Sequence, residues 1–411
     1  MWFYVLLFNL QFMERIYLDY SATTPVAPEV KEAMEPYFSE HFGNPGSIHS
    51  WGQKAQAALD HSREIIADEL NVKFSEVVFT GSATEANNLV VRGVAAGSKG
   101  IDKPRIIVSA IEHPSVLETA RALTADGVEM VCIGVNKEGF VDLQALKNSL
   151  NERTVLVSII YASNEIGTIQ PIQEIAKIIG DFRKQIANSK GQSTGDSRLA
   201  ISSLPLLHTD IVQAFQFFKM DLQELGVDAF SVSGHKIYGP KGVGVLVLRN
   251  EWEPYLGRTI TGGHQELGLR AGTENVPAIV GLGKAVELVS HDREEEAKRI
   301  GSLRDYFWEK LKRALPEIEL NGSPGNRLPN NLNICFPNKE SGDLLIKLDQ
   351  AGVAVSAGSA CSAKAPKPSH VITALGMGEK RARQSLRFTL GRPTTKEEID
   401  IALGRIVKLL N

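Results

Sequence analysis

Short apolar runs alternate with longer helical patterns over most of the chain. Runs rich in β-branched residues fall at 76–81, 105–110, 128–135, 154–162, 229–234 and 243–249, and a further strand is predicted to lead to His208. Strands separated by helices require crossover connections, so we predict an α/β fold with a mostly parallel sheet covered by helices on both faces. Ligands of such sheets lie beyond the carboxyl ends of the strands.

The pattern changes near residue 275. A long charged helix is predicted to follow, and mixed charge of this kind is typical of a solvated helix face. Beyond it, strand-like runs alternate with helices. We predict a large domain at 16–275, with its N-terminal segment packing on the other domain, and a smaller α+β domain at 276–411.

Two segments depart from this plan. The apolar start of the chain is too short to span a bilayer and lacks the features of a signal peptide, and Met13 could itself be the first residue. We therefore expect residues 1–15 to be a dispensable extension. Residues 188–203 are small, polar and rich in glycine and serine, which predicts a flexible insertion loop.

Composition narrows the class of protein. Of the 411 residues, 43% are hydrophobic and 23% are charged, and the formal net charge is -3. The chain therefore lacks the basic excess typical of nucleic-acid-binding proteins, and it also lacks the long apolar stretch typical of membrane proteins. The three cysteines are too few for a disulfide framework or a CxxC metal site. We expect a reducing, cytoplasmic location and no resident metal. Cys132 and Cys335 lie in apolar runs that predict buried thiols.

Small residues between a strand and a helix suggest an anion site. Ser82, Ala83 and Thr84 open a predicted helix, where free backbone N–H groups and the helix dipole favour a phosphate. Ordinary helix capping by Ser82 is the alternative. Neither GxGxxG nor a P-loop is present, so a nucleotide is not favoured.

Polar residues follow several other strands. Asp210 can cap a helix or pair with a buried pyridinium nitrogen, as pyridoxal phosphate requires, and Gln213 lies close behind it. His113 can lie flat on an aromatic cofactor, and Asn164 can donate to a phenolic oxygen. Each of these residues, taken singly, also has an ordinary structural interpretation.

Lys236 indicates which chemistry these candidate residues share, because a lysine can form a Schiff base with an aldehyde. In the stretch SGHKIYGPKG it is surrounded by small residues, and a buried lysine beside an aromatic or cationic group loses its proton more easily. Ser233 and His235 can bind a phosphate while Lys236 reaches an aldehyde. Lys241 is interpreted as a surface lysine.

Two residues of the C-terminal part complete the candidates. Cys361 lies among small residues near Lys364 and Lys367, which favours a reactive thiolate, although an incidental surface thiol is the alternative. Arg387 can hold a carboxylate with its fork of donors, or it can form a simple surface ion pair.

Nine stretches together indicate a family, and they occur along the chain in this order: YLDYSATTP, FGNPGSIHSWG, TGSATEANN, EHPSV, SNEIGTIQP, SGHKIYGPKG, RAGTEN, GSACSA and LRFTLGR. Together they resemble the cysteine desulfurases of the NifS/IscS type, from Ile16 to the C-terminus. The resemblance implies the fold type I architecture of pyridoxal-phosphate enzymes in the class V aminotransferase group. It also implies a seven-stranded type of sheet and a homodimer.

The resemblance assigns roles to the candidate residues. It implies catalytic roles for Lys236 as the Schiff-base lysine, His113 and Cys361. The implied cofactor contacts are Ser82, Ala83, Thr84, His113, Asn164, Asp210, Gln213, Ser233, His235, Lys236 and, from the second subunit, Thr273. The implied contacts to the L-cysteine substrate are Asn44, Asn164 and Arg387.

The implied reaction places sulfur from L-cysteine on Cys361 as a persulfide and releases L-alanine. A mobile loop at 356–368 then delivers the sulfur to an acceptor such as an iron–sulfur scaffold, and Cys361 can transiently ligate a cluster. The alternatives are a selenocysteine lyase or cysteine-sulfinate desulfinase, and a non-catalytic assembly subunit. The intact set of Lys236, His113, Asp210 and Cys361 argues against the last of these.

Overall fold

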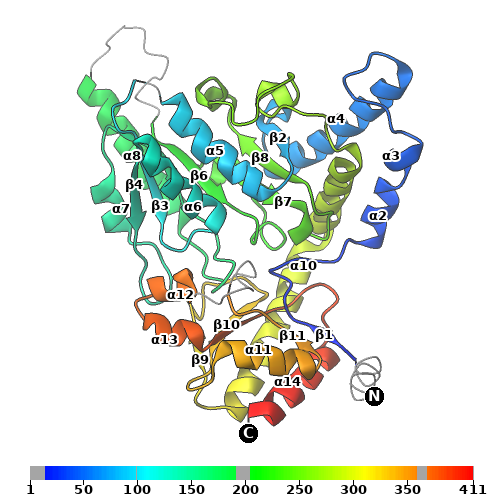
Figure 1. Ribbon diagram of the computed structural model, residues 1–411, viewed down its shortest axis with the longest axis vertical. Coiled ribbons are helices and arrows are strands. Elements are labelled where there is room, and N and C mark those ends of the chain that lie inside the picture. The colour runs from blue at the N-terminus through cyan, green and yellow to red at the C-terminus, as the bar shows by residue number, and fades with distance from the viewer. Residues whose placement is uncertain (1–13, 99, 191–203, 359–367, 411) are drawn as a thin grey trace.

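The structure is a computed structural model that describes residues 14–98, 100–190, 204–358 and 368–410. A large unit is built on a seven-stranded sheet, a smaller unit lies beside it, and the long helix α10 runs from one into the other (Figure 1). Three predicted features fall outside the described residues: most of the extension, most of the insertion loop, and Cys361 with the residues around it.

The large sheet has the strand order β2-β8-β7-β6-β5-β3-β4. Its strands are β2 Val77–Thr80, β3 Arg105–Ser109, β4 Glu129–Ile133, β5 Thr154–Ser158, β6 Leu206–Asp210, β7 Ala229–Ser233 and β8 Gly244–Leu248. β8 pairs antiparallel with both β2 and β7, and the other pairs of neighbouring strands in this sheet are parallel. The predicted mostly parallel sheet is therefore confirmed.

Helices cover both faces of this sheet. The α-helices of the large unit are α2 Pro28–Met34, α3 Pro36–Ser39, α4 Ser50–Leu70, α5 Ala83–Gly97, α6 Pro114–Ala122, α7 Leu143–Ser149, α8 Ile172–Lys190 and α9 Leu222–Leu225. Its 3-10 helices are η1 Phe74–Glu76, η2 Leu123–Asp126, η4 Gly234–Lys236, η5 Asn250–Tyr255 and η6 Glu266–Gly268.

Adjacent strand residues enter different hydrophobic cores because side chains alternate across a sheet. Val78 and Leu246 pack in the core that includes α5 and α6, whereas Phe79 and Val247 pack in the core that includes α4, α8 and α10. Complete burial of a side chain of this size contributes about 1.5–3 kcal/mol. Burial on both faces explains why these strands read as continuous apolar runs.

The small unit contains a three-stranded antiparallel sheet of order β12-β10-β9. Its elements are β9 Glu319–Asn321, β10 Asn331–Cys335, α11 Ser341–Gln350, β11 Val353–Ala354, α12 His370–Ala374, α13 Gly378–Arg383, β12 Ser385–Thr389 and α14 Lys396–Leu410. The N-terminal strand β1 Ile16–Tyr17 pairs in parallel with β11, Ile16 against Val353. The start of the chain therefore lies on the small unit before it enters the large one.

The predicted long charged helix is confirmed as α10 Val276–Ala314. Asn275 caps its start by accepting a hydrogen bond from the Ala278 N–H at 3.3 Å. The helix kinks at Asp292, whose φ of −125° is not helical. Its first half packs on α4 and α2 of the large unit, and its later half contacts β10 and α14 of the small unit.

Two local predictions were wrong. Residues 188–190 belong to helix α8, so the predicted loop begins too early: the helical pattern continues into its first polar residues. Cys132 is exposed, and it lies on β4, the edge strand of the large sheet, which has a neighbouring strand on one side only. Cys335 is buried as predicted. Within the described ranges, no helix is both long enough and apolar enough to cross a membrane.

Candidate active site

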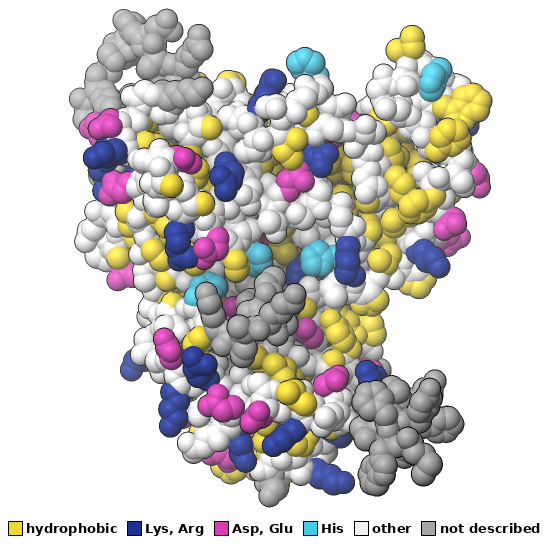
Figure 2. All heavy atoms as spheres, in the orientation of Figure 1, with side chains coloured by type: hydrophobic (Ala, Val, Ile, Leu, Met, Phe, Trp, Pro, Cys, Tyr) yellow, Lys and Arg dark blue, Asp and Glu magenta, His cyan; other side chains and the backbone are white. Residues whose placement is uncertain are grey.

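A cavity of about 260 Å³ lies at the carboxyl ends of the central strands. Its walls come from the N-terminal segment, from the loops after β2, β3, β5, β6 and β7, and from β12 of the small unit. Figure 2 shows histidine side chains gathered at the narrow waist between the two units. The lining residues are Ser21, Ala22, Ser82, Ala83, Thr84, Asn87, His113, Ser115, Ile160, Asn164, Asp210, Val212, Gln213, Ser233, His235, Lys236 and Arg387.

The N-terminus of α5 forms one wall of the cavity. Ser82 caps the helix, since its Oγ accepts a hydrogen bond from the Glu85 N–H at 3.1 Å. A Cβ atom at Gly244 would lie 2.6 Å from the Ser82 carbonyl carbon and 2.8 Å from the Ala83 nitrogen, so glycine is needed for β8 to approach this turn. The helix end offers free N–H groups and a positive dipole to an anion.

Lys236 projects from η4, directly after β7. Its Nζ donates to the carbonyl oxygen of Ala22 at 2.7 Å and also to that of Ser21. The neighbouring His235 has its Nδ1 3.2 Å from Thr23 Oγ1. Burial, followed by the positive charges of Lys236 and Lys241, lowers the pKa of His235 to about 4. His235 is therefore neutral at physiological pH and can offer a hydrogen bond without adding charge.

Asp210 ends β6 and is buried. Its Oδ2 accepts a hydrogen bond from Asn87 Nδ2 at 2.9 Å, and its Oδ1 accepts one from the Val212 N–H at 3.0 Å. Asn87 also donates to Ser115 Oγ at 2.8 Å. These bonds orient the Asp210 carboxylate in the cavity wall, where it can accept a hydrogen bond from a protonated nitrogen of a ligand.

His113 caps α6 at the edge of the cavity. Its Nδ1 accepts from the Ser115 N–H at 3.1 Å and lies 2.7 Å from Ser115 Oγ, which orients the ring. Burial lowers the pKa of His113, Asp210 partly opposes this effect, and Lys236 adds to it. A neutral imidazole held in this way can lie against a flat aromatic molecule.

Arg387 enters the cavity from β12 and is only 2% exposed. Its Nη2 donates to Asp19 Oδ1 at 2.7 Å, and its Nη1 donates to the Asn164 carbonyl oxygen at 2.9 Å. The ion pair considered from the sequence is thus present, but Arg387 is buried and Asp19 only partly exposed, so the pair is not a surface pair. Asp19, on the N-terminal segment, is what orients the guanidinium.

Several polar atoms of the cavity wall lack a hydrogen-bond partner among the described residues. These buried atoms are Ser21 Oγ, Asn87 Oδ1, Gln213 Oε1 and Arg387 Nε. Leaving such an atom unsatisfied costs about 1–3 kcal/mol. The cavity is therefore suited to a polar ligand that pairs with them.

Three predicted residues do not line this cavity. Thr273 borders a separate cavity with Arg270 and Glu274. Asn44 is exposed, and its Oδ1 accepts a hydrogen bond from the Gly46 N–H at 2.9 Å. Cys361 lies outside the described residues.

The chain on either side of Cys361 is described, and both flanks meet Glu165. Ser369 Oγ donates to Glu165 Oε2 at 2.5 Å, and a Cβ at Gly358 would lie 3.0 Å from the same oxygen. Glu165 is buried and directly follows Asn164 of the cavity wall. The Glu165 carboxylate therefore binds the flank at Ser369 and lies close to the flank at Gly358.

Besides the apolar Ile160 and Val212, sequence reasoning missed four lining residues: Ser21, Ala22, Asn87 and Ser115. All four occur inside the recognised stretches, which was the available signal. Their roles depend on partners more than 20 residues away, such as Asp210 for Asn87 and Lys236 for the Ala22 carbonyl. No local pattern identifies such partners.

Comparison with known proteins gives consistent matches. A family model described as aminotransferase class-V matches residues 16–187 and 198–402. A cysteine desulfurase IscS from Dictyoglomus turgidum is 42% identical over 395 residues, which are 96% of this chain and 94% of the relative. A cysteine desulfurase IscS 1 from Archaeoglobus fulgidus is 42% identical over 384 residues, covering 93% of this chain and 94% of the relative.

Solved structures agree with these relatives. A structure described as a NifS-like protein superposes with a TM-score of 0.86 at 34% identity, covering 96% of this chain and 99% of that one. A second, described as SspA in complex with cysteine, has a TM-score of 0.77 at 35% identity, covering 91% of this chain and 98% of that one. The family indicated by the sequence motifs is confirmed: the chain belongs to the class-V aminotransferases and, among them, to the group of NifS-like proteins named cysteine desulfurases.

Proposed function

We propose that this protein is a cysteine desulfurase that uses pyridoxal phosphate to remove sulfur from L-cysteine and releases L-alanine. The observation that carries the proposal is the convergence of Lys236, Asp210, His113 and Arg387 on one cavity. The names of the relatives, and the solved complex of a 35% identical protein with cysteine, support the choice of substrate.

The cavity wall fits each chemical group of pyridoxal phosphate. Lys236 can react with the aldehyde, and Asp210 can pair with the protonated ring nitrogen. The unsatisfied Gln213 Oε1 and the Asn164 side chain suit the polar edge of the ring, and His113 suits its face. The remaining polar groups suit the phosphate: the α5 N-terminus with Ser82, Ala83 and Thr84, together with Ser233 and His235.

The chain's own residues perform the steps around the cofactor. Bound pyridoxal phosphate supplies an electron sink for negative charge on the carbon next to the substrate's amine. Lys236 Nζ takes the proton from that carbon, while Arg387 holds the substrate's carboxylate through its charged fork. His113 covers the reacting region and limits the access of water.

Cys361 is proposed to take the sulfur. Its thiolate attacks the sulfur of the substrate, so a sulfur–sulfur bond forms and the carbon–sulfur bond breaks with its electron pair left on carbon. A proton then reaches that carbon and alanine leaves. Cys361 lies three residues beyond Gly358, and an extended chain covers about 3.5 Å per residue, so a span of about 10 Å is available from the flank at Glu165.

The further partners are proposed on the same basis. An iron–sulfur scaffold fits as the sulfur acceptor, because the relatives carry the name IscS. A homodimer would let Thr273 of one subunit approach the phosphate site of the other. Chromatography with light scattering should give the mass of two chains, whereas a single-chain mass would contradict the dimer.

The direct test supplies the purified protein with L-cysteine and dithiothreitol, and measures sulfide and alanine. Cys361→Ala should abolish sulfide release, and mass spectrometry of the wild type should find the extra sulfur on Cys361. Cys132→Ser is the matched control, because Cys132 is exposed and does not line the cavity. Undiminished sulfide release by Cys361→Ala would refute the persulfide step. Turnover of selenocysteine or cysteine sulfinate without turnover of cysteine would identify the alternative enzymes.

A further inference from the structure

Tyr238, two residues after Lys236, has an unusual backbone. Its φ is 64°, in the left-handed region that large side chains rarely adopt. Such a conformation persists only where the surrounding structure holds it. The turn itself is tight, because the N–H groups of Ile237 and Gly239 both donate to the Gly234 carbonyl at 3.0 Å.

The N-terminal segment holds the backbone of Tyr238. The Tyr238 N–H donates to Thr24 Oγ1 at 2.9 Å, and its carbonyl accepts from the Ala27 N–H at 2.9 Å. This segment also supplies the Ser21 and Ala22 carbonyls that accept from Lys236 Nζ. The backbone of the turn and the tip of the lysine are therefore held by one stretch of chain.

The side chain of Tyr238 is held from the opposite direction. Its hydroxyl accepts from the Arg392 N–H at 2.7 Å, and the Arg392 guanidinium lies 5.6 Å from the centre of its ring. Tyr238 is buried, and burial raises its pKa, so the hydroxyl stays neutral. This geometry is that of a cation–π contact combined with a hydrogen bond.

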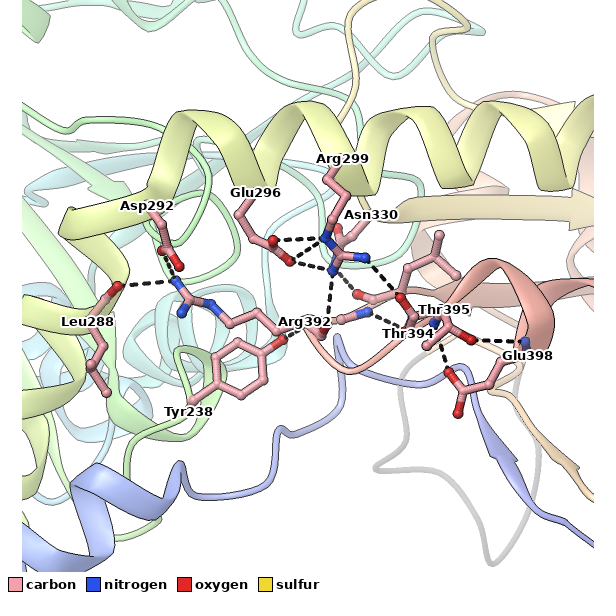
Figure 3. Close-up of polar contacts among 12 residues, drawn as sticks. Tyr238, Leu288, Asp292, Glu296, Arg299, Asn330, Arg392, Thr394, Thr395 and Glu398 are labelled. Atoms are coloured by element: carbon pink, nitrogen blue, oxygen red, sulfur yellow. Dashed lines mark hydrogen bonds and ion pairs between the residues drawn. The ribbon is translucent and has the colours of Figure 1, made fainter.

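Arg392 is itself anchored to α10. Its Nη2 donates to the Leu288 carbonyl at 3.2 Å and pairs with Asp292, the residue at the kink of α10. Arg299 Nη2 donates to the Arg392 carbonyl at 2.9 Å. Figure 3 shows Arg392 between Tyr238 and Asp292, with Arg299 reaching across from the same helix.

We propose that Tyr238 is a positioning residue for Lys236. Arg392 holds its side chain and Thr24 holds its backbone, and the left-handed turn that results directs Lys236 into the cavity. This inference rests on the proposed function in that it takes Lys236 to be the lysine that binds the cofactor. It adds that the small unit, through Arg392, sets the position of a catalytic group in the large unit.

The decisive variant is Tyr238→Gly. Glycine adopts a positive φ without strain, so this variant removes the side-chain contacts and still permits the conformation. We expect kcat to fall about tenfold with KM for cysteine changed less than about twofold, because a small misplacement of a reacting group is costly. In the cofactor-loaded protein, the pH midpoint of the visible absorption should shift by about half a unit, because it reports the surroundings of the lysine nitrogen.

Two further variants grade the effect. Tyr238→Phe keeps the ring under Arg392 and loses only the hydroxyl, so it should retain more activity than Tyr238→Gly. Arg392→Gln keeps the backbone N–H and removes the guanidinium from the ring, so it should shift the absorption midpoint in the same direction as Tyr238→Gly. It also remains informative if Tyr238→Gly does not fold.

Asn338→Gly is the matched control. Asn338 has a φ of 63°, is exposed and does not line the cavity, so kcat and the absorption midpoint should stay at wild-type values. If Tyr238→Gly and Arg392→Gln both kept the midpoint and kcat within twofold of wild type, the positioning role would be overturned. Failure of the proposed desulfurase function would give a different result, because the wild type would then release no sulfide. Borohydride would still fix the cofactor on Lys236, and the absorption midpoints of the variants would still decide the role of Tyr238.

Discussion

Two charged side chains enter the cavity from different units, and they are held in different ways. Lys236 comes from the large unit and donates to the backbone carbonyls of Ser21 and Ala22. Arg387 comes from the small unit and pairs with the carboxylate of Asp19. Asp19, Ser21 and Ala22 belong to one N-terminal segment, which also pairs with β11 through β1.

The difference has a consequence for mutation. Carbonyl partners survive a side-chain substitution that leaves the backbone in place, so Lys236 Nζ keeps these two contacts when the Ser21 or Ala22 side chain changes. The charged partner of Arg387 is the Asp19 side chain, which one substitution removes, although the bond to the Asn164 carbonyl would remain. A buried ion pair that loses one member leaves an uncompensated charge, which is strongly destabilising. Side-chain substitutions in the N-terminal segment should therefore disturb Arg387 more than Lys236.

The largest effect is expected for Lys236→Ala. The proposed chemistry depends on this amine, so sulfide release should fall by at least about a thousandfold, and the visible absorption should be lost. Lys241→Ala is the control, since Lys241 is exposed and does not line the cavity. Sulfide assays and absorption spectra of both variants make the measurement. Equal losses in the two variants would contradict the assignment of Lys236.

The next effect tests the Arg387 side. Asp19→Asn should lower the free energy of unfolding by about 3–5 kcal/mol, because buried Arg387 loses its charged partner. Urea unfolding measures this change. Lys396→Gln provides a matched control at the exposed pair with Asp400, where solvent screens the charges and the loss should be much smaller. Similar losses at both pairs would remove the contrast between the two sides.

A smaller effect concerns pH and Glu112, whose backbone carbonyl lies 3.0 Å from His370 Nε2 of the small unit. Burial raises the pKa of Glu112 to about 8. The folded state thus binds a proton that the unfolded state releases above pH 4.5, so this group lowers stability as pH rises from 4.5 to 8. Glu112→Gln should remove that loss, so its Tm relative to wild type should be higher at pH 8 than at pH 5. An unchanged difference between the two pH values would be evidence against a neutral Glu112.

The smallest effect has the opposite sign and lies on the Lys236 side. The pKa of His235 is lowered to about 4 from its ordinary 6.5, so the unfolded state binds more protons between these values. Stability from this group is present above pH 6.5 and is lost as pH falls through 4. His235→Gln should flatten the fall of Tm over that range, measured by thermal unfolding at several pH values. A steeper fall in the variant would contradict a neutral His235.

The sequence predicted much of the fold because its signals are local. Apolar runs such as 105–110 and 154–162 contain the buried strands β3 and β5, and the charged segment after residue 275 forms α10. The exception at Cys132 shows the limit. Its run looks like the others, but the strand lies at the edge of the sheet, and the position of a strand within a sheet depends on contacts that are distant in sequence.

In the candidate site, too, some features could be predicted from the sequence and others could not. Lys236, His113, Asp210 and Arg387 were recognisable because their residue types occur in distinctive motifs within or just after strands, and all four line one cavity. The bonds that orient these groups join distant parts of the chain: Asn87 to Asp210, and Asp19 to Arg387. Hydrogen bonds of this kind depend on how the sheets and helices pack.

The sequence by itself therefore determined the α/β class, the family and the residue types needed for the chemistry, because periodicity and motifs are properties of neighbouring residues. Only the tertiary structure decided that one N-terminal segment holds both Lys236 and Arg387. The tertiary structure alone also placed Arg392, from the end of the chain, on the strained Tyr238. The physical reason is that a side chain's direction is set by the partners it finds after folding, and these partners lie up to hundreds of residues away.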